Sequence, residues 1–231
     1  MSSQSDISPL FSLEDVCFAY DGGPDVLSSL NLEIAAGEFL LLLGANGSGK
    51  TTVLKLLDGL LFPRGGSVAF RGEPLTEVRL AQPEFNRRFR RQVGLLFQNP
   101  EIQLFCPTVA EDVAFGPSQL GLGPESTAER VRDALNLLGI PGLAGRSVLS
   151  LSDGEKQRVA LAGVLALNPE VLLLDEPFAS LDAEAAGSLL GLLARLHETG
   201  KTIVVATHEP GRFAGFTARA VNLSADSSLL P

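Results

Sequence analysis

The chain has 231 residues, 45% of them hydrophobic, and a formal net charge of −9 at pH 7. Such a composition is typical of a globular protein with one large domain or two small ones. The acidic balance argues against a nucleic-acid-binding protein, which would carry a basic patch. The longest apolar run, Val159 to Leu167, is far too short to span a bilayer.

Two further features bear on where the protein works. Residues 1–11 lack the basic and apolar regions of a signal peptide, so we expect a cytosolic chain whose membrane association comes through a partner. Cys17 and Cys106 match no metal-ligand spacing and are expected to be reduced thiols. Residues 224–228 are expected to be a frayed end.

Hydrophobic periodicity predicts strands that alternate with helices along most of the chain. The predicted strands cover residues 11–20, 26–34, 40–43, 65–70, 92–97, 171–176, 202–206 and 221–223. The predicted helices cover residues 50–60, 107–114, 124–138, 152–168 and 182–196. Buried aliphatic strands that alternate with helices predict an α/β protein with a mostly parallel sheet and a helical subdomain.

Residues 44–51 read GANGSGKT, which matches the phosphate-binding pattern G-x-x-x-x-G-K-[ST] between a predicted strand and a predicted helix. The glycines let consecutive backbone N–H groups face inward as an anion nest, and the helix adds the positive end of its dipole. Lys50 would reach the β- and γ-phosphates, and the Thr51 hydroxyl would hold Mg²⁺. The alternative is a glycine-rich turn with a chance lysine. The predicted ligands in the loop are Gly44, Asn46, Gly47, Ser48, Gly49, Lys50 and Thr51.

Polar or aromatic residues stand at the ends of several predicted strands. Gln98, Asp175 and His208 fall at the carboxyl ends of aliphatic strands, as Gly44 does. Ligands of parallel α/β sheets bind at these ends, so we expect one site there. Tyr20 ends the first strand, where it would either stack on adenine or be an ordinary aromatic of the sheet.

Two adjacent carboxylates suit the hydrolysis of a nucleotide. Asp175 is placed to bind Mg²⁺ directly or through water, and Glu176 to orient or deprotonate an attacking water. His208 would hydrogen-bond a γ-phosphate or that water. The alternatives are a solvated carboxylate pair and a lone surface histidine. His197, near a helix C-terminus, is expected only to favour the helix dipole.

These motifs together resemble the nucleotide-binding subunit of ABC transporters. The motifs that carry the resemblance are GANGSGKT, Gln98, LSDGE at 151–155, VLLLDE at 171–176, SLD at 180–182 and His208, in the family's order and approximate spacing. The resemblance runs from residue 11 to residue 223. It implies a P-loop NTPase fold with an antiparallel β region near the N-terminus, and cofactors ATP and Mg²⁺. It also implies that two subunits enclose two ATP molecules head to tail.

The resemblance further implies one ATPase domain over residues 1–231. Residues 11–97 and 165–223 would form its core, and residues 98–164 its helical subdomain. Within that subdomain, residues 151–155 are the signature segment. Ser152 followed by Glu155 is by itself a helix capping box. In the family, however, Ser152 and Gly154 complete the phosphate site of the other subunit.

The resemblance also gives single residues their roles. Tyr20 resembles the adenine-stacking aromatic, and Lys50, Thr51 and Thr52 resemble the phosphate and Mg²⁺ ligands. Gln98 resembles the residue that senses Mg²⁺ and couples to the membrane partner, while Asp175 and Glu176 resemble the metal ligand and the catalytic base. Asp182 resembles a dimer contact, and His208 resembles the γ-phosphate switch. Two positions depart from the family's pattern. Asp153 replaces a glycine of the signature, and we expect its side chain to face solvent. Phe178 replaces a small polar residue, with an expected effect on packing only.

A narrower resemblance involves residues 97–105, FQNPEIQLF, and residues 108–117, TVAEDVAFGP. Both resemble the energy-coupling-factor branch, which imports cobalt, nickel or vitamins. In that branch the segment after the glutamine docks a helix of an integral membrane coupling protein, here near Gln98 to Phe105. Ile102, Leu104 and Phe105 would supply an apolar contact patch. The alternative is a core segment of the helical subdomain.

The sequence therefore predicts an importer motor, peripheral to the cytoplasmic face of the membrane. ATP would close a dimer with an identical or related subunit, and hydrolysis would reopen it. The predicted membrane partners are the coupling protein and a substrate-binding subunit, with cobalt or nickel as the first cargo and a vitamin as the second. One alternative is a soluble ABC-type ATPase acting on nucleic acid or ribosomes. The other is a regulator that does not hydrolyse ATP, which Glu176 and His208 oppose.

Overall fold

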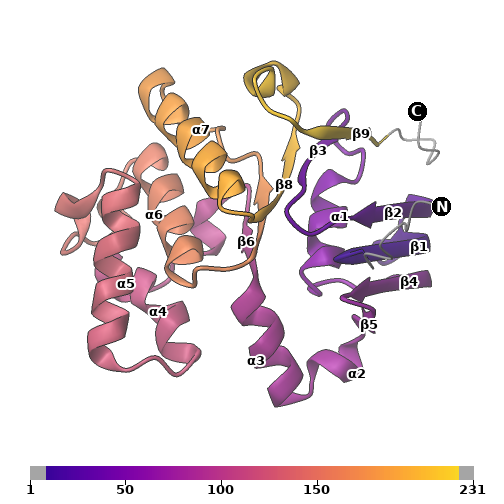
Figure 1. The fold of residues 1–231 in the computed structure, drawn as a ribbon, viewed down its shortest axis with the longest axis horizontal. Coiled ribbons are helices and arrows are strands. Elements are labelled where there is room, and N and C mark those ends of the chain that lie inside the picture. The colour runs from indigo at the N-terminus through magenta and orange to yellow at the C-terminus, as the bar shows by residue number, and fades with distance from the viewer. Residues whose placement is uncertain (1–8, 224–231) are drawn as a thin grey trace, which may run out of the picture. The chain divides into compact units, whose positions relative to one another are not determined.

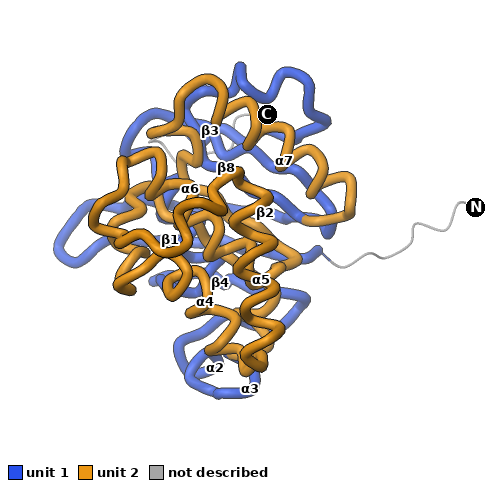
Figure 2. The backbone as a smooth tube through the Cα atoms, turned by 90° about the vertical axis from the view of Figure 1, so that its left-hand side faces the viewer, with its two compact units in different colours: residues 1–86, 202–231 blue, residues 87–201 orange. Residues whose placement is uncertain are grey.

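The computed structural model describes residues 9–223, so the frayed end expected at residues 224–228 lies outside the described part. Contacts between residues divide the chain into two compact units, residues 1–86 with 202–231 and residues 87–201 (Figure 2). These two units do not have the same boundaries as the core and the helical subdomain that the sequence predicts. The predicted core and helical subdomain, with their boundaries, therefore stay predictions.

The first unit contains an antiparallel sheet near the N-terminus (Figure 1). Its strands, in spatial order, are β2 (Asp25–Ile34), β1 (Phe11–Ala19), β4 (Gly65–Phe70) and β5 (Glu73–Pro74). Leu13 of β1 stands opposite Leu32 and Val68 of its two neighbours, and all three side chains are buried. Their burial on one face of the sheet fixes the register of the strands.

The same unit contains parallel strands that carry the phosphate loop. β3 (Phe39–Leu43) lies between β8 (Thr202–Thr207) and β9 (Arg219–Asn222) and runs parallel to both. Its first four residues are buried, as expected of a strand covered on both faces. β3 leads through residues 44–49 into α1 (Lys50–Leu57). A short helical turn, Pro210–Phe213, precedes β9.

The segment before residue 92 is helical, although the sequence indicated only a polar connection there. It forms α2 (Glu77–Leu80) and α3 (Pro83–Gln92). Phe85 and Phe89, four residues apart on α3, are buried, while Arg87 and Arg91 are exposed. The basic run is thus the solvated face of an amphipathic helix.

The second unit combines a parallel strand pair with helices. β6 (Val93–Leu96) pairs with β7 (Val171–Asp175). The helices are α4 (Val109–Gln119), α5 (Pro124–Leu137), α6 (Asp153–Ala166) and α7 (Ala183–Glu198), with short turns at Pro100–Ile102, Pro141–Leu143 and Val148–Ser150. Side chains of α4, α5 and α6 share one apolar core, which includes Val113, Leu135 and Val159. No helix within residues 9–223 is long and apolar enough to cross a membrane.

Candidate functional site

The phosphate loop, residues 44–49, depends on its glycines. Gly44, Gly47 and Gly49 have φ angles of 150°, 82° and 94°, a region that residues with a side chain rarely adopt. A Cβ at Gly44 would also lie 2.4 Å from Ser48 Oγ and 2.5 Å from Leu223 O. The backbone path of the loop therefore requires glycine at these positions.

The loop and the first turn of α1 offer hydrogen-bond donors to an anion. Gly49 provides no side-chain cap and the first turn of α1 has no acidic residue, so the positive end of the helix is not neutralised by a carboxylate of that turn. Lys50 is 6% exposed, and its Nζ donates to Gly44 O at 2.8 Å and Ala45 O at 3.0 Å. Within residues 9–223, the buried Ser48 Oγ has no hydrogen-bond partner. This donor set fits a polyphosphate, whose oxygens accept hydrogen bonds from all of these groups.

Tyr20 lies beside the phosphate-loop helix, although 32 positions separate it from Thr52. Its Oη is 3.2 Å from Thr52 Oγ1, and its ring packs edge-on against Phe18 with centroids 5.0 Å apart. Tyr20 is 45% exposed, as an aromatic residue that stacks on a bound base would be in the absence of nucleotide. Thr52 is buried and already engaged with Tyr20. Both roles toward the nucleotide stay predictions.

His208 follows β8 in the same unit and is largely exposed. Its Nε2 lies 3.8 Å from Glu209 Oε1. Glu209 also pairs with Arg212, and the hydrogen bond from that guanidinium holds the pKa of the Glu209 carboxyl below its ordinary value. The role of His208 at a γ-phosphate stays a prediction.

The carboxylates Asp175 and Glu176 belong to the second unit, at the end of β7. They are 3% and 9% exposed, so they are buried rather than a solvated pair. Glu176 has φ 44°, which is unusual for a residue other than glycine, asparagine or aspartate and costs about 1–3 kcal/mol. Such strain is concentrated at functional positions. The sequence carries no signal for it, because glutamate is not a residue that favours this conformation.

The signature segment begins α6 with a capping box. Ser152 Oγ accepts a hydrogen bond from Glu155 N at 3.3 Å, and Glu155 Oε2 accepts one from Ser152 N at 2.8 Å. The backbone and hydroxyl hydrogen bonds from Ser152 lower the pKa of the Glu155 carboxyl. The helix start is therefore satisfied within its own chain, and the role of Ser152 toward a second subunit's ATP stays a prediction.

The two residues after Ser152 differ in their surroundings. The Asp153 side chain is 83% exposed, and its Oδ1 lies 3.9 Å from Lys156 Nζ. It faces solvent, as the sequence predicts. A Cβ at Gly154 would lie 2.7 Å from Ser180 O, so glycine allows the first turn of α6 to approach the segment after β7. The replaced signature glycine thus lies on the open side of the turn, and the retained one on the packed side.

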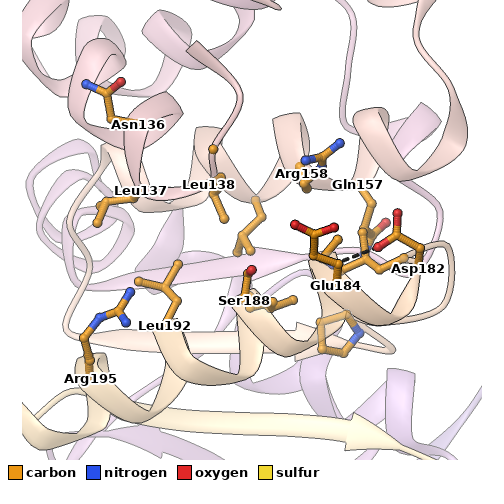
Figure 3. A pocket seen from close by; sticks show the side chains of 16 residues that line it. Asn136, Leu137, Leu138, Gln157, Arg158, Asp182, Glu184, Ser188, Leu192 and Arg195 are labelled. Carbon is orange, nitrogen blue, oxygen red and sulfur yellow. Dashed lines mark hydrogen bonds between the residues drawn. The ribbon is translucent and has the colours of Figure 1, made fainter. Parts of the chain in front are cut away.

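A cavity of about 520 Å³ lies in the second unit between α5, α6 and α7. Figure 3 shows Arg158, Gln157 and Asp182 at one end and Arg195 at the other. Asp182 Oδ1 caps α7 by accepting from Ala185 N at 2.8 Å. Within the described residues, Nε2 and Oε1 of the buried Gln157 have no protein hydrogen-bond partner, so the amide of Gln157 presents a donor and an acceptor at this cavity.

The segment after Gln98 exposes an apolar patch. Ile102 and Phe105 are 65% and 63% exposed. The Phe105 ring stands edge-on to that of Phe115 with centroids 4.8 Å apart, and Phe115 is itself 43% exposed. Leu104 instead packs against the helical core, as in the alternative interpretation. Ile102, Phe105 and Phe115 are called the coupling patch below.

Comparison with known proteins decides the family. A family model described as "ABC transporter" matches residues 27–179, which include the phosphate loop, the signature segment and Asp175 with Glu176. The chain belongs to the ABC transporter family. The predicted resemblance to ABC nucleotide-binding subunits is therefore confirmed.

Several curated relatives of this ABC protein are similar over most of their length. The nickel import ATP-binding protein NikO of Rhodobacter capsulatus is 46% identical over 95% of this chain and 87% of its own. The nickel import ATP-binding protein LarO of Lactiplantibacillus plantarum is 46% identical over 86% of this chain and 82% of its own. The energy-coupling factor transporter ATP-binding protein EcfA of Methanocaldococcus jannaschii is 43% identical over 85% of this chain and 69% of its own. The relatives thus include proteins named for the branch that the sequence resembles.

Solved structures confirm the fold of the ABC cassette. cbiO1 from Clostridium perfringens, described as part of the ABC transporter complex cbiONQ, has a TM-score of 0.81 at 32% identity over 96% of this chain and 87% of its own. The dimeric cassette MJ0796 in a post-hydrolysis state with ADP and Pi has a TM-score of 0.86 at 29% identity over 96% of this chain and 97% of its own. This chain is an ATP-binding ATPase with the predicted P-loop NTPase fold.

Proposed function

We propose that this ABC ATPase is the motor subunit of an energy-coupling-factor type importer. Nickel or cobalt is the first proposed cargo and a vitamin the second. The observation that carries the proposal is the 46% identity to a nickel import ATP-binding protein over 95% of the chain. The exposed coupling patch after Gln98 supports it, because an exposed apolar patch is a typical surface for a protein partner.

The proposed nucleotide contacts follow from the loop geometry. The N–H groups of residues 44–49 with Asn46 and Ser48 would cradle the phosphates, Lys50 and Thr52 would bind them, and Tyr20 would stack on adenine. Thr51, Gln98 and Asp175 would hold Mg²⁺, which neutralises charge on the transferred phosphoryl group. The described residues contain no group of three or more His, Cys, Asp or Glu side chains that could by themselves hold a metal ion. Magnesium commonly uses one or two protein carboxylates with phosphate oxygens and water, so this donor set suits it.

The proposed chemistry uses residues of two subunits. Glu176 would accept a proton from the attacking water, and His208 would hydrogen-bond the γ-phosphate. Ser152 and Gly154, at the positive end of α6, would contact the ATP of a second, identical or related subunit, with Asp182 at the dimer contact. ATP would close the dimer, and hydrolysis would reopen it.

The proposed partners place the protein at the cytoplasmic face of the membrane as a peripheral subunit. An integral membrane coupling protein would contact the segment from Gln98 to Phe105, and a substrate-binding membrane subunit would complete the importer. In the proposed domain plan, residues 11–97 and 165–223 form the core and residues 98–164 the helical subdomain that bears the coupling patch. Nucleic acid is not a proposed partner, in keeping with the net charge of −9.

Affinity purification from detergent-solubilised membranes tests the proposal. The tagged full chain should recover an integral membrane protein, and Phe105→Glu should lose it, because a charge in an apolar contact is unfavourable. Val78→Glu is the matched control, since Val78 is 77% exposed on α2, outside the coupling patch. Recovery of ribosomes or nucleic-acid-bound factors instead would favour the soluble ABC-type ATPase.

A further inference from the structure

The segment that carries the coupling patch is tied to α6 at two points. Lys156 Nζ lies 2.5 Å from Glu101 Oε1, and Gln103 Nε2 donates to Ala160 O at 3.2 Å. Gln103 Oε1 also accepts from Phe97 N at 3.3 Å, so one amide side chain links the end of β6 with α6. Lys156 and Ala160 are one turn apart on the helix and therefore lie on one face.

A third contact fixes the backbone of the patch itself. The Asp112 side chain on α4 is buried, and its Oδ2 accepts from Phe105 N at 2.9 Å and Cys106 N at 2.8 Å. Asn99 Oδ1 accepts from Glu101 N at 2.9 Å and starts the short helical turn at Pro100–Ile102. The patch is thus held by several hydrogen bonds rather than carried on a loose loop.

Ser152 is the N-cap of α6, and Lys156 lies about one turn further along the chain, within the helix. An α-helix is stiff over one turn, so a displacement of Glu101 or Gln103 would move the start of the helix with it. Glu101 is 63% exposed and the Lys156 side chain 16% exposed. An ion pair of this kind contributes little to global stability, so its loss should act locally.

We infer that Glu101, Gln103 and Lys156 are positioning residues that couple the coupling patch to the start of α6, where Ser152 lies. The inference rests on the proposed function, since it assigns Ser152 to the ATP site of a second subunit. The clamp formed by these three side chains would fix the position of Ser152 relative to the membrane partner bound at the coupling patch. A membrane partner would thereby gain a direct connection to the phosphate-contacting end of α6.

Hydrogen exchange and steady-state kinetics on the purified full chain test the clamp. Glu101→Gln, Lys156→Met and Gln103→Leu should each raise amide exchange in residues 152–158 and lower kcat about two- to fivefold. The Kd for ATP should stay unchanged, because Lys50 binds it. Lys156→Arg should restore kcat, since it keeps the cation. Glu73→Gln, which removes a comparable ion pair to Arg79 in the first unit, is the matched control and should change neither quantity.

A double-mutant cycle separates the clamp from unrelated effects. Adding Glu101→Gln to Lys156→Met should lower kcat no further than Lys156→Met alone, because the lysine change has already removed the ion pair with Glu101. Additive losses, or unchanged exchange at residues 152–158 in the single variants, would overturn the inference. Failure of the proposed function would look different: affinity purification with the wild-type chain would then recover no integral membrane protein, whatever the clamp variants do.

Discussion

Lys50 places its ammonium group among the backbone carbonyls of the phosphate loop, where phosphate oxygens would replace them. We expect Lys50→Ala to weaken ATP binding about ten- to a hundredfold, because a hydrogen bond to a charged group contributes about 1.5–3 kcal/mol. Titration with a fluorescent ATP analogue measures this loss. Lys55→Ala, in the last turn of the same helix, is the control and should bind ATP normally. Equal binding by the wild type and Lys50→Ala would contradict the proposed role.

Asp153 stands where the resemblance to ABC subunits implies a glycine of the signature segment. Because its side chain points to solvent, 83% exposed, we expect Asp153→Gly to change ATPase activity little. Comparison of kcat and KM for ATP in the two proteins checks this. A many-fold rise in activity would show instead that the carboxylate of the wild type intrudes on a neighbouring phosphate.

Single residues also mark the limit of what the sequence predicts. The glycines of the phosphate loop were predictable, because their positive φ angles belong to a known backbone motif. The strained φ of Glu176 was not, since it depends on how the end of β7 is packed. Phe115 was missed as a patch residue because it contacts Phe105 only after the segment folds back onto α4. Leu104 was misplaced for the same reason, as it turns toward the core.

At the scale of elements, the capping box of α6 should make stability depend on pH. Hydrogen bonds from Ser152 lower the folded-state pKa of Glu155, so the stabilisation is present above the ordinary glutamate pKa of about 4.3 and is lost as pH falls through the lowered value. The free energy of unfolding should therefore differ between the wild type and Glu155→Gln at pH 7 and converge in acid. Urea unfolding across this pH range measures the difference.

Element boundaries were predictable where local chemistry sets them. Ser152 and Thr108 cap α6 and α4, each with a glutamate three residues on, and the sequence places both helix starts within a residue or two. α3 escaped prediction because only Phe85 and Phe89 mark its buried face among many arginines. The strand ends at Asp175 and Thr207 were easier, because aliphatic runs stop there.

At the scale of the whole molecule, the capping box at Ser152 bears on how two subunits would associate reversibly. The Ser152 hydroxyl donates to Glu155 Oε2 at 3.0 Å within its own chain, so donation to a phosphate oxygen of a second subunit's ATP would replace one hydrogen bond with another. Such an exchange is nearly balanced in free energy, which suits a reversible contact. Affinity of the two subunits would then follow ATP rather than a permanent interface.

Glu176→Gln tests this arrangement in solution. The amide keeps the size of the side chain but accepts a proton poorly, so hydrolysis should stop while ATP still binds. We expect the variant with ATP and Mg²⁺ to move from the 24.3 kDa of one chain to twice that mass, measured by light scattering after size exclusion. Glu198→Gln should hydrolyse ATP like the wild type. Unchanged activity in Glu176→Gln would refute the role of Glu176, and an inactive variant that binds ATP but stays monomeric would refute closure of two identical subunits.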